Sequence, residues 1–256
     1  MGSVWNFALK KIIMSKSKLM CNFFKILGVV VTAVSLSSCL KTGTNNSTSS
    51  SNISFITLMN MAPYSSSTEL YFNDAKTTPA ISPGSFSTTY GHVTPGAYDI
   101  KFKVANSDSI LSELATSYYD SLGFYTLILY NPSAGSAVNA MKIVDDFSTL
   151  SYTGSNYRFF NLCPDYSVVD LYMNGTKVQP GRTLGDNAYS SYFNTFSPIT
   201  AGGYAIQVKK SGTDSVIASI SSVGLQQGNA YTVFLQGSLH NSSNPVTLSI
   251  LQAAYY

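Results

Sequence analysis

The chain has 256 residues, of which 15 are Lys or Arg, 12 are Asp or Glu and 18 are Tyr. Five of the basic residues, but no acidic residue, lie within the first 25 positions, so the remainder has no basic excess. Because proteins that bind nucleic acid need a basic surface, this composition excludes nucleic acid as a partner.

The N-terminal segment has the three parts of an export signal. Its lysines precede an uncharged apolar run, Ile26–Leu36, which two serines separate from Cys39. The run is shorter than the roughly 20 residues of a membrane-spanning helix. The sequence Leu36–Cys39, LSSC, resembles the bacterial lipobox. This resemblance implies that residues 1–38 are a cleaved lipoprotein signal peptide and that Cys39 carries lipid. An ordinary signal peptide with an incidental cysteine is the alternative.

Lipid on Cys39 predicts a membrane anchor. Two or three acyl chains hold a protein far better than one, so we expect a location at the outer membrane, on its periplasmic or its cell-surface face. Cleavage leaves ten basic against twelve acidic residues, a net charge of −2. It also discards Cys21, so Cys163 is the remaining free thiol. Neither a disulfide within the chain nor a thiolate metal cluster is then expected.

Residues 39–51 are dominated by Ser, Thr and Asn and show no hydrophobic periodicity. This composition is typical of a flexible tether. Such a short tether spans roughly 20 Å and holds a domain close to the membrane surface.

From residue 52 onward the sequence contains two copies of one pattern. Five segments recur in the same order: NMAP (60–63) as NLCP (161–164), ELYFND (69–74) as DLYMNG (170–175), VTPGAYDIKF (93–102) as ITAGGYAIQV (199–208), DSIL (108–111) as DSVI (214–217), and YTLIL (125–129) as YTVFL (231–235). The offset changes from 101 to 106 residues, which places a five-residue insertion between Asn174 and Gly202. The pattern predicts two domains, residues 52–148 and 155–256, joined by a short linker.

Local signals in both copies favour strands. YDIKFK (98–103) and YAIQVK (204–209) alternate apolar and polar residues, as half-buried strands do. Asn174-Gly175 follows an apolar run and is typical of a two-residue hairpin turn. We expect no helix after Cys39. Short strands in copies of this length predict an all-β fold, with two tandem β-sandwich domains resembling immunoglobulin or transthyretin-like domains.

One set of motif residues carries a family resemblance. It consists of Asn161, Pro164, Val169, Asp170, Tyr172, Gly175, Gly202 and Tyr204. This pattern, Asn-x-x-Pro followed by Val-Asp-apolar-Tyr-x-x-Gly and a later Gly-x-Tyr strand, resembles a bacterial domain of unknown function, number 4397 in its series. In the first copy Glu69 replaces the Asp and Asp74 replaces the Gly. The resemblance covers nearly all of the mature chain. It implies an exported, often paired β-sandwich, and it implies no activity.

Residues that carry catalysis or bind metal form no recognisable motif. The two histidines, His92 and His240, have no counterpart in the other copy. No nucleophile elbow, zinc-protease helix or phosphate-binding loop occurs, so we predict no catalytic residue, no metal site and no cofactor. Asp145 and Asp146 are adjacent and point to opposite faces of a strand. We interpret them as solvated strand-end charges.

Several other residues have both a structural and a functional interpretation. Cys163 corresponds to Ala62, which favours a small packed side chain over a reactive thiol. Asp170 and Tyr172, like Glu69 and Tyr71, share one strand face. They form either part of a polar groove or, as we favour, a structural pair in which the acid binds the backbone of a neighbouring turn. Three Asp-Ser-apolar triplets, starting at Asp108, Asp120 and Asp214, resemble a glycosylation motif of some bacterial envelopes and also suit ordinary turns.

Tyrosines of the insertion are the best candidates for a binding surface. Tyr189, Tyr192 and Phe193 cluster there. Tyr combines an apolar face with a terminal hydroxyl, which suits sugar stacking, although strand packing is its commoner role. The expected partners are the membrane, through Cys39, and a glycan or another envelope protein.

These observations favour a non-enzymatic outer-membrane lipoprotein that acts as a binding or assembly module of the cell envelope. The first alternative is a subunit of a pilus-like surface polymer that assembles by strand addition, for which the strand-like end PVTLSILQAAYY (245–256) would serve. A hydrolase with a dispersed site is the second alternative.

Overall fold

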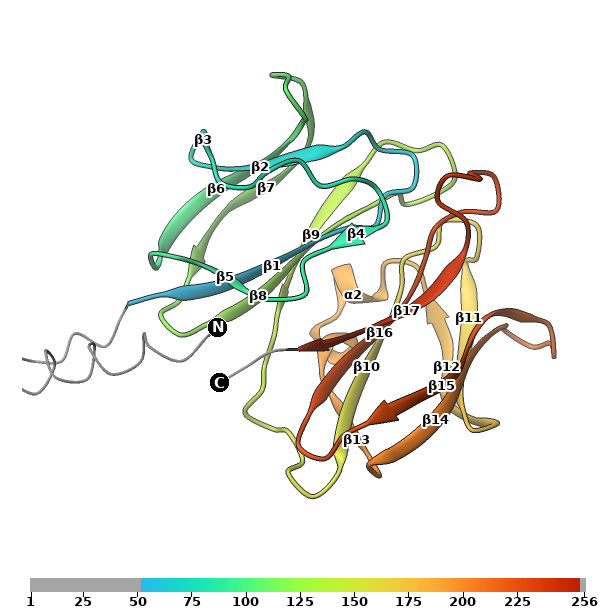
Figure 1. Cartoon of the computed structure of the whole chain (residues 1–256). Coiled ribbons are helices and arrows are strands. Elements are labelled where there is room, and N and C mark those ends of the chain that lie inside the picture. Colours follow the sequence, from blue (N-terminus) through green and yellow to red (C-terminus); the bar gives the residue numbers. More distant parts are fainter. Residues whose placement is uncertain (1–51, 254–256) are drawn as a thin grey trace, which may run out of the picture. The chain divides into compact units, whose positions relative to one another are not determined.

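The computed structural model describes residues 52–253, and β-strands dominate them (Figure 1). The signal peptide, Cys39 and nearly all of the tether therefore lie outside the described residues. The first repeat contributes β1 (Ser54–Asn60), β2 (Thr68–Phe72), β3 (Ala75–Lys76), β4 (Ser85–Phe86), β5 (Gly91–Val93), β6 (Gly96–Val104), β7 (Ile110–Tyr119), β8 (Phe124–Tyr130) and β9 (Asn139–Val144).

The second repeat has the same order of strands, except that β4 has no counterpart. Its strands are β10 (Ser155–Asn161), β11 (Val168–Met173), β12 (Thr176–Thr183), β13 (Ser197–Ile199), β14 (Gly202–Lys210), β15 (Val216–Leu225), β16 (Ala230–Gln236) and β17 (Thr247–Ala253). Two short helical turns, α2 (Asp186–Tyr189) and the 3-10 helix Ser191–Asn194, precede β13.

Each repeat folds into two sheets. In the first repeat, β4-β1-β8-β9 form a sheet that we call inner sheet 1, with β5 also pairing with β1, and β3-β2-β6-β7 form outer sheet 1. In the second repeat, β13-β10-β16-β17 form inner sheet 2 and β12-β11-β14-β15 form outer sheet 2. One pair of strands in each repeat is parallel: β1 with β8 in the first repeat and β10 with β16 in the second. The other pairs are antiparallel. This arrangement confirms the predicted all-β, sandwich-type fold.

Each sandwich has its own apolar core between an inner and an outer sheet. Alternate residues of the strands supply it, as the period of two requires. The first core includes Leu58, Leu70, Ile100, Phe102 and Leu127, and the second includes Phe159, Leu171, Ile206, Val208 and Val233.

A third apolar cluster joins the two repeats. It contains Met59 and Ile128 from inner sheet 1 together with Phe160 and Phe234 from inner sheet 2. These side chains lie on the faces of the inner sheets that point away from the two sandwich cores, so β10 and β16 are buried along their whole lengths. The described residues, 52–253, consequently belong to one compact unit.

The turn after β11 confirms the predicted hairpin. Asn174 and Gly175 both have positive φ, 48° and 77°, as a two-residue hairpin turn requires. In the first repeat Asn73 and Asp74 adopt the same geometry, with φ of 46° and 66°. Asp therefore occupies a position where the second repeat has Gly, and Lys101 lies 2.8 Å from its carboxylate.

The segment between Asn174 and Gly202 differs between the repeats. β12 is eight residues long where β3 has two, and residues 184–196 add α2 and the 3-10 turn. We call residues 184–196 the insertion loop. The expectation of no helix after Cys39 is wrong at this place. A four-residue helix has no room for a periodic apolar pattern, and hydrogen bonds from neighbouring segments hold it instead.

Candidate binding groove

The insertion loop presents two of the three predicted aromatic residues to solvent. Tyr189 is 88% exposed and Tyr192 is 76% exposed. The Phe193 ring instead packs over the Arg182 guanidinium, 4.4 Å from the ring centre, and contacts the Tyr192 ring edge-on. Phe193 therefore supports the surface that the two tyrosines form.

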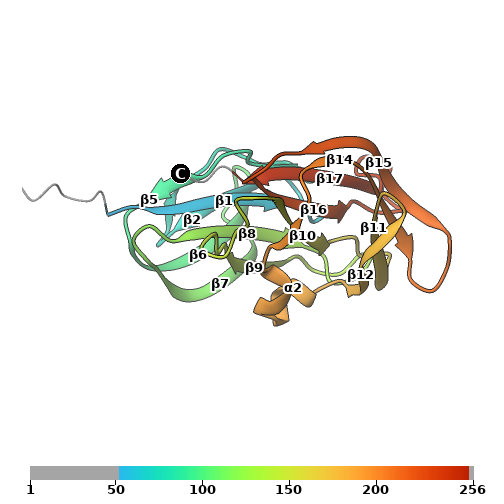
Figure 2. The same cartoon turned by 90° about the horizontal axis from the view of Figure 1, so that it is seen from below.

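A groove separates these tyrosines from the first repeat. One wall is the insertion loop, and the other is the end of β9, with Lys142 and Val144, together with Asp146 just after it. The volume of the groove is about 700 Å³. Figure 2 shows α2 beside β9, which is the edge of inner sheet 1. We call this hollow the aromatic groove.

A second hollow lies on the other side of Tyr192. It has a volume of about 340 Å³ and is lined by residues that include Gln179, Pro180 and Phe193. Tyr192 and Thr195 line both hollows. Tyr192 and Thr195 therefore lie where two neighbouring depressions meet.

Asn187, which is buried, and Asn194, which is partly buried, give the insertion loop a defined shape. The Asn187 amide donates to the Asn194 Oδ1 at 2.9 Å and to the Phe193 carbonyl at 3.0 Å. Asn194 in turn donates to the Asn187 carbonyl at 3.1 Å. Arg182 donates to the Asn187 Oδ1 at 3.3 Å and pairs with Asp186 at 3.0 Å. These contacts fix both ends of the loop that carries Tyr189 and Tyr192.

A buried ion pair ties the groove's two walls together. Arg158 of β10 lies 2.7 Å from Asp145, which follows β9, and both side chains are at most 2% exposed. Asp145 also accepts hydrogen bonds from Tyr90 at 2.8 Å and Thr126 at 2.6 Å, and Arg158 donates to the Asn194 carbonyl at 3.3 Å. Burial beside this carboxylate raises the pKa of the Tyr90 phenol. The interpretation of Asp145 as a solvated charge is therefore wrong, because Asp145 is buried and paired with Arg158. The sequence analysis did not identify this partner, because Arg158 belongs to the other repeat.

Asp146, unlike Asp145, is a solvated charge at the end of a strand, as expected. It is exposed, and both the hydroxyl and the amide of Ser148 donate to its carboxylate, which lowers its pKa. Lys142 lies at the other end of the same wall. Its ammonium sits 4.4 Å from the centre of the Tyr119 ring and donates to the Ser117 hydroxyl at 2.8 Å. Partial burial lowers the pKa of Lys142.

The repeated acid–tyrosine pairs have the structural role that we favoured. Asp170 accepts from the Gly181 backbone at 2.8 Å and lies 2.7 Å from Lys177. Burial alone would raise the pKa of Asp170, but the hydrogen bonds it accepts outweigh burial and lower it. Glu69 accepts from Lys76 at 2.7 Å and from Tyr71 at 3.2 Å, and the Lys76 hydrogen bond is the main reason that its pKa is lowered.

The remaining candidates do not converge on a reactive centre. Cys163 is fully buried, and burial raises the pKa of its thiol to about 11, so it is a packed side chain as expected. His92 lies on β5, whereas His240 is 3.8 Å from Asp165 in the second repeat. Within residues 52–253, no three or more His, Cys, Asp and Glu side chains gather in a way that suits a metal ion. No helix among the described residues has the length and apolarity to cross a membrane.

The Asp-Ser-apolar triplets all lie at exposed turns. Ser109 and Ser215 occupy the equivalent hairpins between β6 and β7 and between β14 and β15, and Ser121 lies between β7 and β8. All three serines are exposed. The triplets thus lie in turns, where Asp and Ser are common. Their glycosylation remains a prediction.

The residues that shape the groove were largely missed by the sequence analysis. Asn187, Asn194 and Arg182 carry no motif. Arg158 did leave a signal, because it interrupts the apolar strand YRFFN (157–161), and a charge in a buried strand needs a partner. That signal indicates a buried ion pair without identifying Asp145.

Comparison with known proteins gives a family but no function. No curated protein matches the sequence. A family model described as a domain of unknown function, DUF4397, matches residues 54–172 and again residues 155–253. These matches confirm the resemblance drawn from the Asn-x-x-Pro and Val-Asp-apolar-Tyr motifs. The two matches together extend over most of the chain, which therefore belongs to the DUF4397 family.

Proposed function

We propose that this protein is a non-enzymatic lipoprotein of the outer membrane that binds a saccharide chain in the aromatic groove. Lipid on Cys39 would hold it at the membrane, on the periplasmic or the cell-surface face. The observation that carries the proposal is the pair of exposed tyrosines, Tyr189 and Tyr192, on a loop held by side-chain hydrogen bonds between Asn187 and Asn194.

The chemistry of the groove supports a saccharide. A pyranose ring presents an apolar C–H face that packs on a tyrosine ring, and its hydroxyls bond to polar groups at the rim. The groove offers both, since Val144 and the tyrosines are apolar while Lys142, Asp146 and Ser191 are polar. The two hollows that flank Tyr192 suit a ligand longer than one sugar ring.

Rigidity of the insertion loop supports the same proposal. Ordering a loop on binding costs affinity, so a loop that is already ordered retains more of the contact energy. The Asn187–Asn194 contacts and the Arg158–Asp145 ion pair hold the two walls at a set separation. Tyr189 and Tyr192 are thus exposed on a loop that these contacts hold in place.

The polymer alternative is disfavoured by the C-terminal strand. β17 pairs with β16 along its whole length, from Ala230↔Ala253 to Gln236↔Thr247, and Leu248 is buried in the second core. Donation of this strand to another subunit would remove it from its own sheet. The strand is therefore used within the chain, as a binding module requires.

Binding is tested on an array of bacterial envelope glycans with the purified protein and the variants Y189A and Y192A. We expect each substitution to weaken saccharide binding by roughly tenfold, or about 1.4 kcal/mol, because each removes a stacking face. Tyr152 is 70% exposed and does not line the groove, so Y152A is the matched control and keeps full binding. Binding that survives Y189A/Y192A, or binding to an envelope protein in place of any glycan, would contradict the proposal.

Anchoring is tested separately by growing cells with a labelled fatty acid. The wild-type protein should take up the label and partition with the outer membrane, whereas C39A should do neither. An unlabelled wild-type protein would show that the LSSC sequence is part of an ordinary signal peptide.

A further inference from the structure

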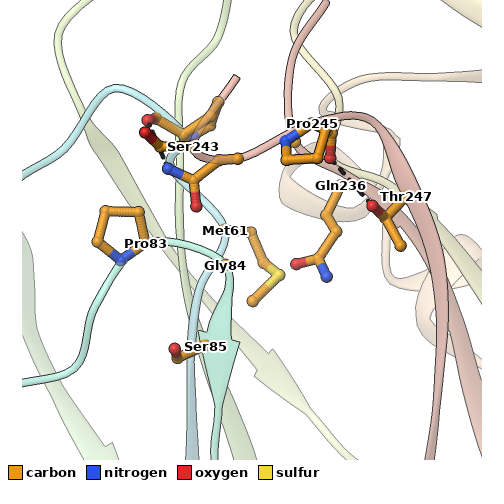
Figure 3. Close-up of a pocket in the computed structure, with 11 residues that line it drawn as sticks. Met61, Pro83, Gly84, Ser85, Gln236, Ser243, Pro245 and Thr247 are labelled. Carbon is orange, nitrogen blue, oxygen red and sulfur yellow. Dashed lines mark hydrogen bonds between the residues drawn. The ribbon is translucent and has the colours of Figure 1, made fainter. Parts of the chain in front are cut away.

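A third hollow lies at the opposite edge of the inner sheets. Its walls are the turn after β1, the start of β4 and the loop between β16 and β17, so both repeats contribute to it (Figure 3). It has a volume of about 200 Å³. β4 and β9 are the two edges of inner sheet 1, which separates this pocket from the aromatic groove. We call it the junction pocket.

One polar atom in the junction pocket lacks a partner. Gln236 is the last residue of β16 and is 9% exposed. Its amide nitrogen donates to the Ser249 hydroxyl at 3.1 Å, while its Oε1 is buried and accepts no hydrogen bond. Buried side-chain oxygens without partners are rare and each costs roughly 1–3 kcal/mol. Rotating the amide by half a turn would only exchange an unpaired oxygen for an unpaired NH₂ group.

The sandwich itself does not need this amide. The residue equivalent to Gln236 in the first repeat is Tyr130, whose side chain packs in the apolar cluster between the repeats. An apolar ring thus serves at the same place in the same fold. The amide is specific to the second repeat, where it faces the junction pocket.

Hydrogen bonds between the repeats hold the pocket's walls in place. Asn241 donates to the Pro63 carbonyl at 2.6 Å, and the hydroxyls of Tyr64 and Ser238 are 2.6 Å apart. Gly237 has φ of +85°, and a Cβ there would lie 2.1 Å from the Pro245 carbonyl oxygen. The loop after β16 therefore folds tightly back on itself and is fixed against the first repeat.

The lining identifies the kind of ligand. No charged side chain lines the pocket, which contains Met61 and prolines as apolar surface and amides and hydroxyls as polar surface. The volume equals that of about seven water molecules at 30 Å³ each. A neutral ring that carries hydroxyl groups fits these features, because a hydroxyl pairs with either end of an amide.

We propose that the junction pocket binds one neutral sugar residue, with a sugar hydroxyl donating to the Gln236 Oε1. Figure 3 shows the Met61 side chain between the Gln236 amide and Gly84. The unbranched thioether of Met changes conformation at low cost, so Met61 moves aside when the sugar reaches the covered oxygen. This site goes beyond the aromatic groove and does not depend on it.

The test follows the methionine methyl groups of the full chain by NMR while N-acetylglucosamine, galactose or glucose is added. We expect the Met61 methyl signal to shift and to saturate in the millimolar range with at least one sugar. Met173 lies in the core of the second repeat, so its methyl signal should stay unchanged. A Met61 signal that moves with none of the three sugars overturns the proposal.

Variants separate this site from the groove. Q236L should keep the thermal midpoint and weaken the Met61 response at least tenfold, whereas Y192A should leave that response unchanged. If Q236L does not fold, S243W offers a second test, because Ser243 is exposed and lines the pocket and a Trp there fills it. A response that persists in Q236L or S243W, or that disappears in Y192A, assigns the sugar to another place and overturns the proposal.

Discussion

The two repeats share one set of framework residues and differ in the residues that line hollows. Asn60 and Asn161 both close the turn after the first strand by accepting from the backbone two residues later. Tyr98 and Tyr204 both donate to the carbonyl four residues earlier, at 2.6 and 2.8 Å. These pairs explain why the family pattern contains Asn and a late Tyr: each closes a backbone turn with a side-chain hydrogen bond.

The unshared residues gather where the repeats meet. Arg158 corresponds to Thr57, Gln236 corresponds to Tyr130, and the insertion loop has no counterpart. All three lie at the interface of the inner sheets or at one of its edges. The two repeats therefore share one framework, and the differences between them are concentrated where the repeats contact each other. A function specific to this protein is expected in that region.

The largest difference to test is the buried ion pair. R158M leaves the Asp145 carboxylate buried without its partner, which costs roughly 3–5 kcal/mol. The thermal midpoint should fall by roughly 6–20 °C. Removing both charges, in D145L/R158M, should recover much of the loss, because apolar pairs often replace buried ion pairs without cost.

Two controls sharpen this prediction. T57V changes the equivalent residue of the first repeat and should shift the midpoint far less, since Thr57 makes one hydrogen bond to the Ser87 carbonyl. D214N removes an exposed partner of Lys209 and should have little effect. If R158M melts like the wild type, the ion pair does not hold the repeats together.

A smaller effect is expected for the two paired acids, Glu69 and Asp170. Each should contribute in the same way to the loss of stability at low pH. The pKa values of Glu69 and Asp170 are lowered in the folded protein from ordinary values of 4.5 and 3.8. Folding is then stabilised above those ordinary values, and the stabilisation is lost as the pH falls through the lower folded pKa. Thermal melts between about pH 6 and about pH 3 should show a decline that E69Q/D170N makes shallower.

The single variants test the comparison itself. E69Q and D170N should each flatten the acid decline, because each removes one of two equivalent carboxylates. A decline that depends on only one of them would show that the two pairs are not equivalent, and a decline unchanged in the double variant would exclude both.

The smallest expected effect is at the hairpin turn. G175D puts a side chain at a φ of +77° and should destabilise the protein by about 0.5–1 kcal/mol. D74G removes the same strain from the first repeat but also removes the exposed contact with Lys101, so it should stabilise by less. Urea unfolding of both variants measures the difference, and equal and opposite shifts would mean that the Lys101 contact contributes nothing.

Local patterns predicted the sandwich frame well. Alternation along residues 204–209 and the Asn174-Gly175 turn depend on neighbours within the chain segment, and both form as predicted. The helical turn α2 was missed for the opposite reason. Its shape depends on Arg182, Asn194 and Arg158, which lie outside its four residues.

The candidate groove was predicted only in part. Tyr189 and Tyr192 stood out as an aromatic cluster, and the structure exposes both. Phe193 belongs to the support of the groove, and the opposite wall, β9, comes from the other repeat. A single sequence does not indicate which surfaces of the two repeats contact each other.

The sequence by itself determined the duplication, the all-β class and the family, because repeats, strand periodicity and turn residues are local properties of the chain. Only the tertiary structure decided that Asp145 is paired, that Gln236 has an unpartnered oxygen and that two hollows flank the contact between the inner sheets. These features arise from residues between 13 positions (Asp145 and Arg158) and 186 positions (Met61 and Thr247) apart. Such residues come together only when one face of each inner sheet buries the other. Burial then converts an ordinary charge or amide into a group that requires a partner.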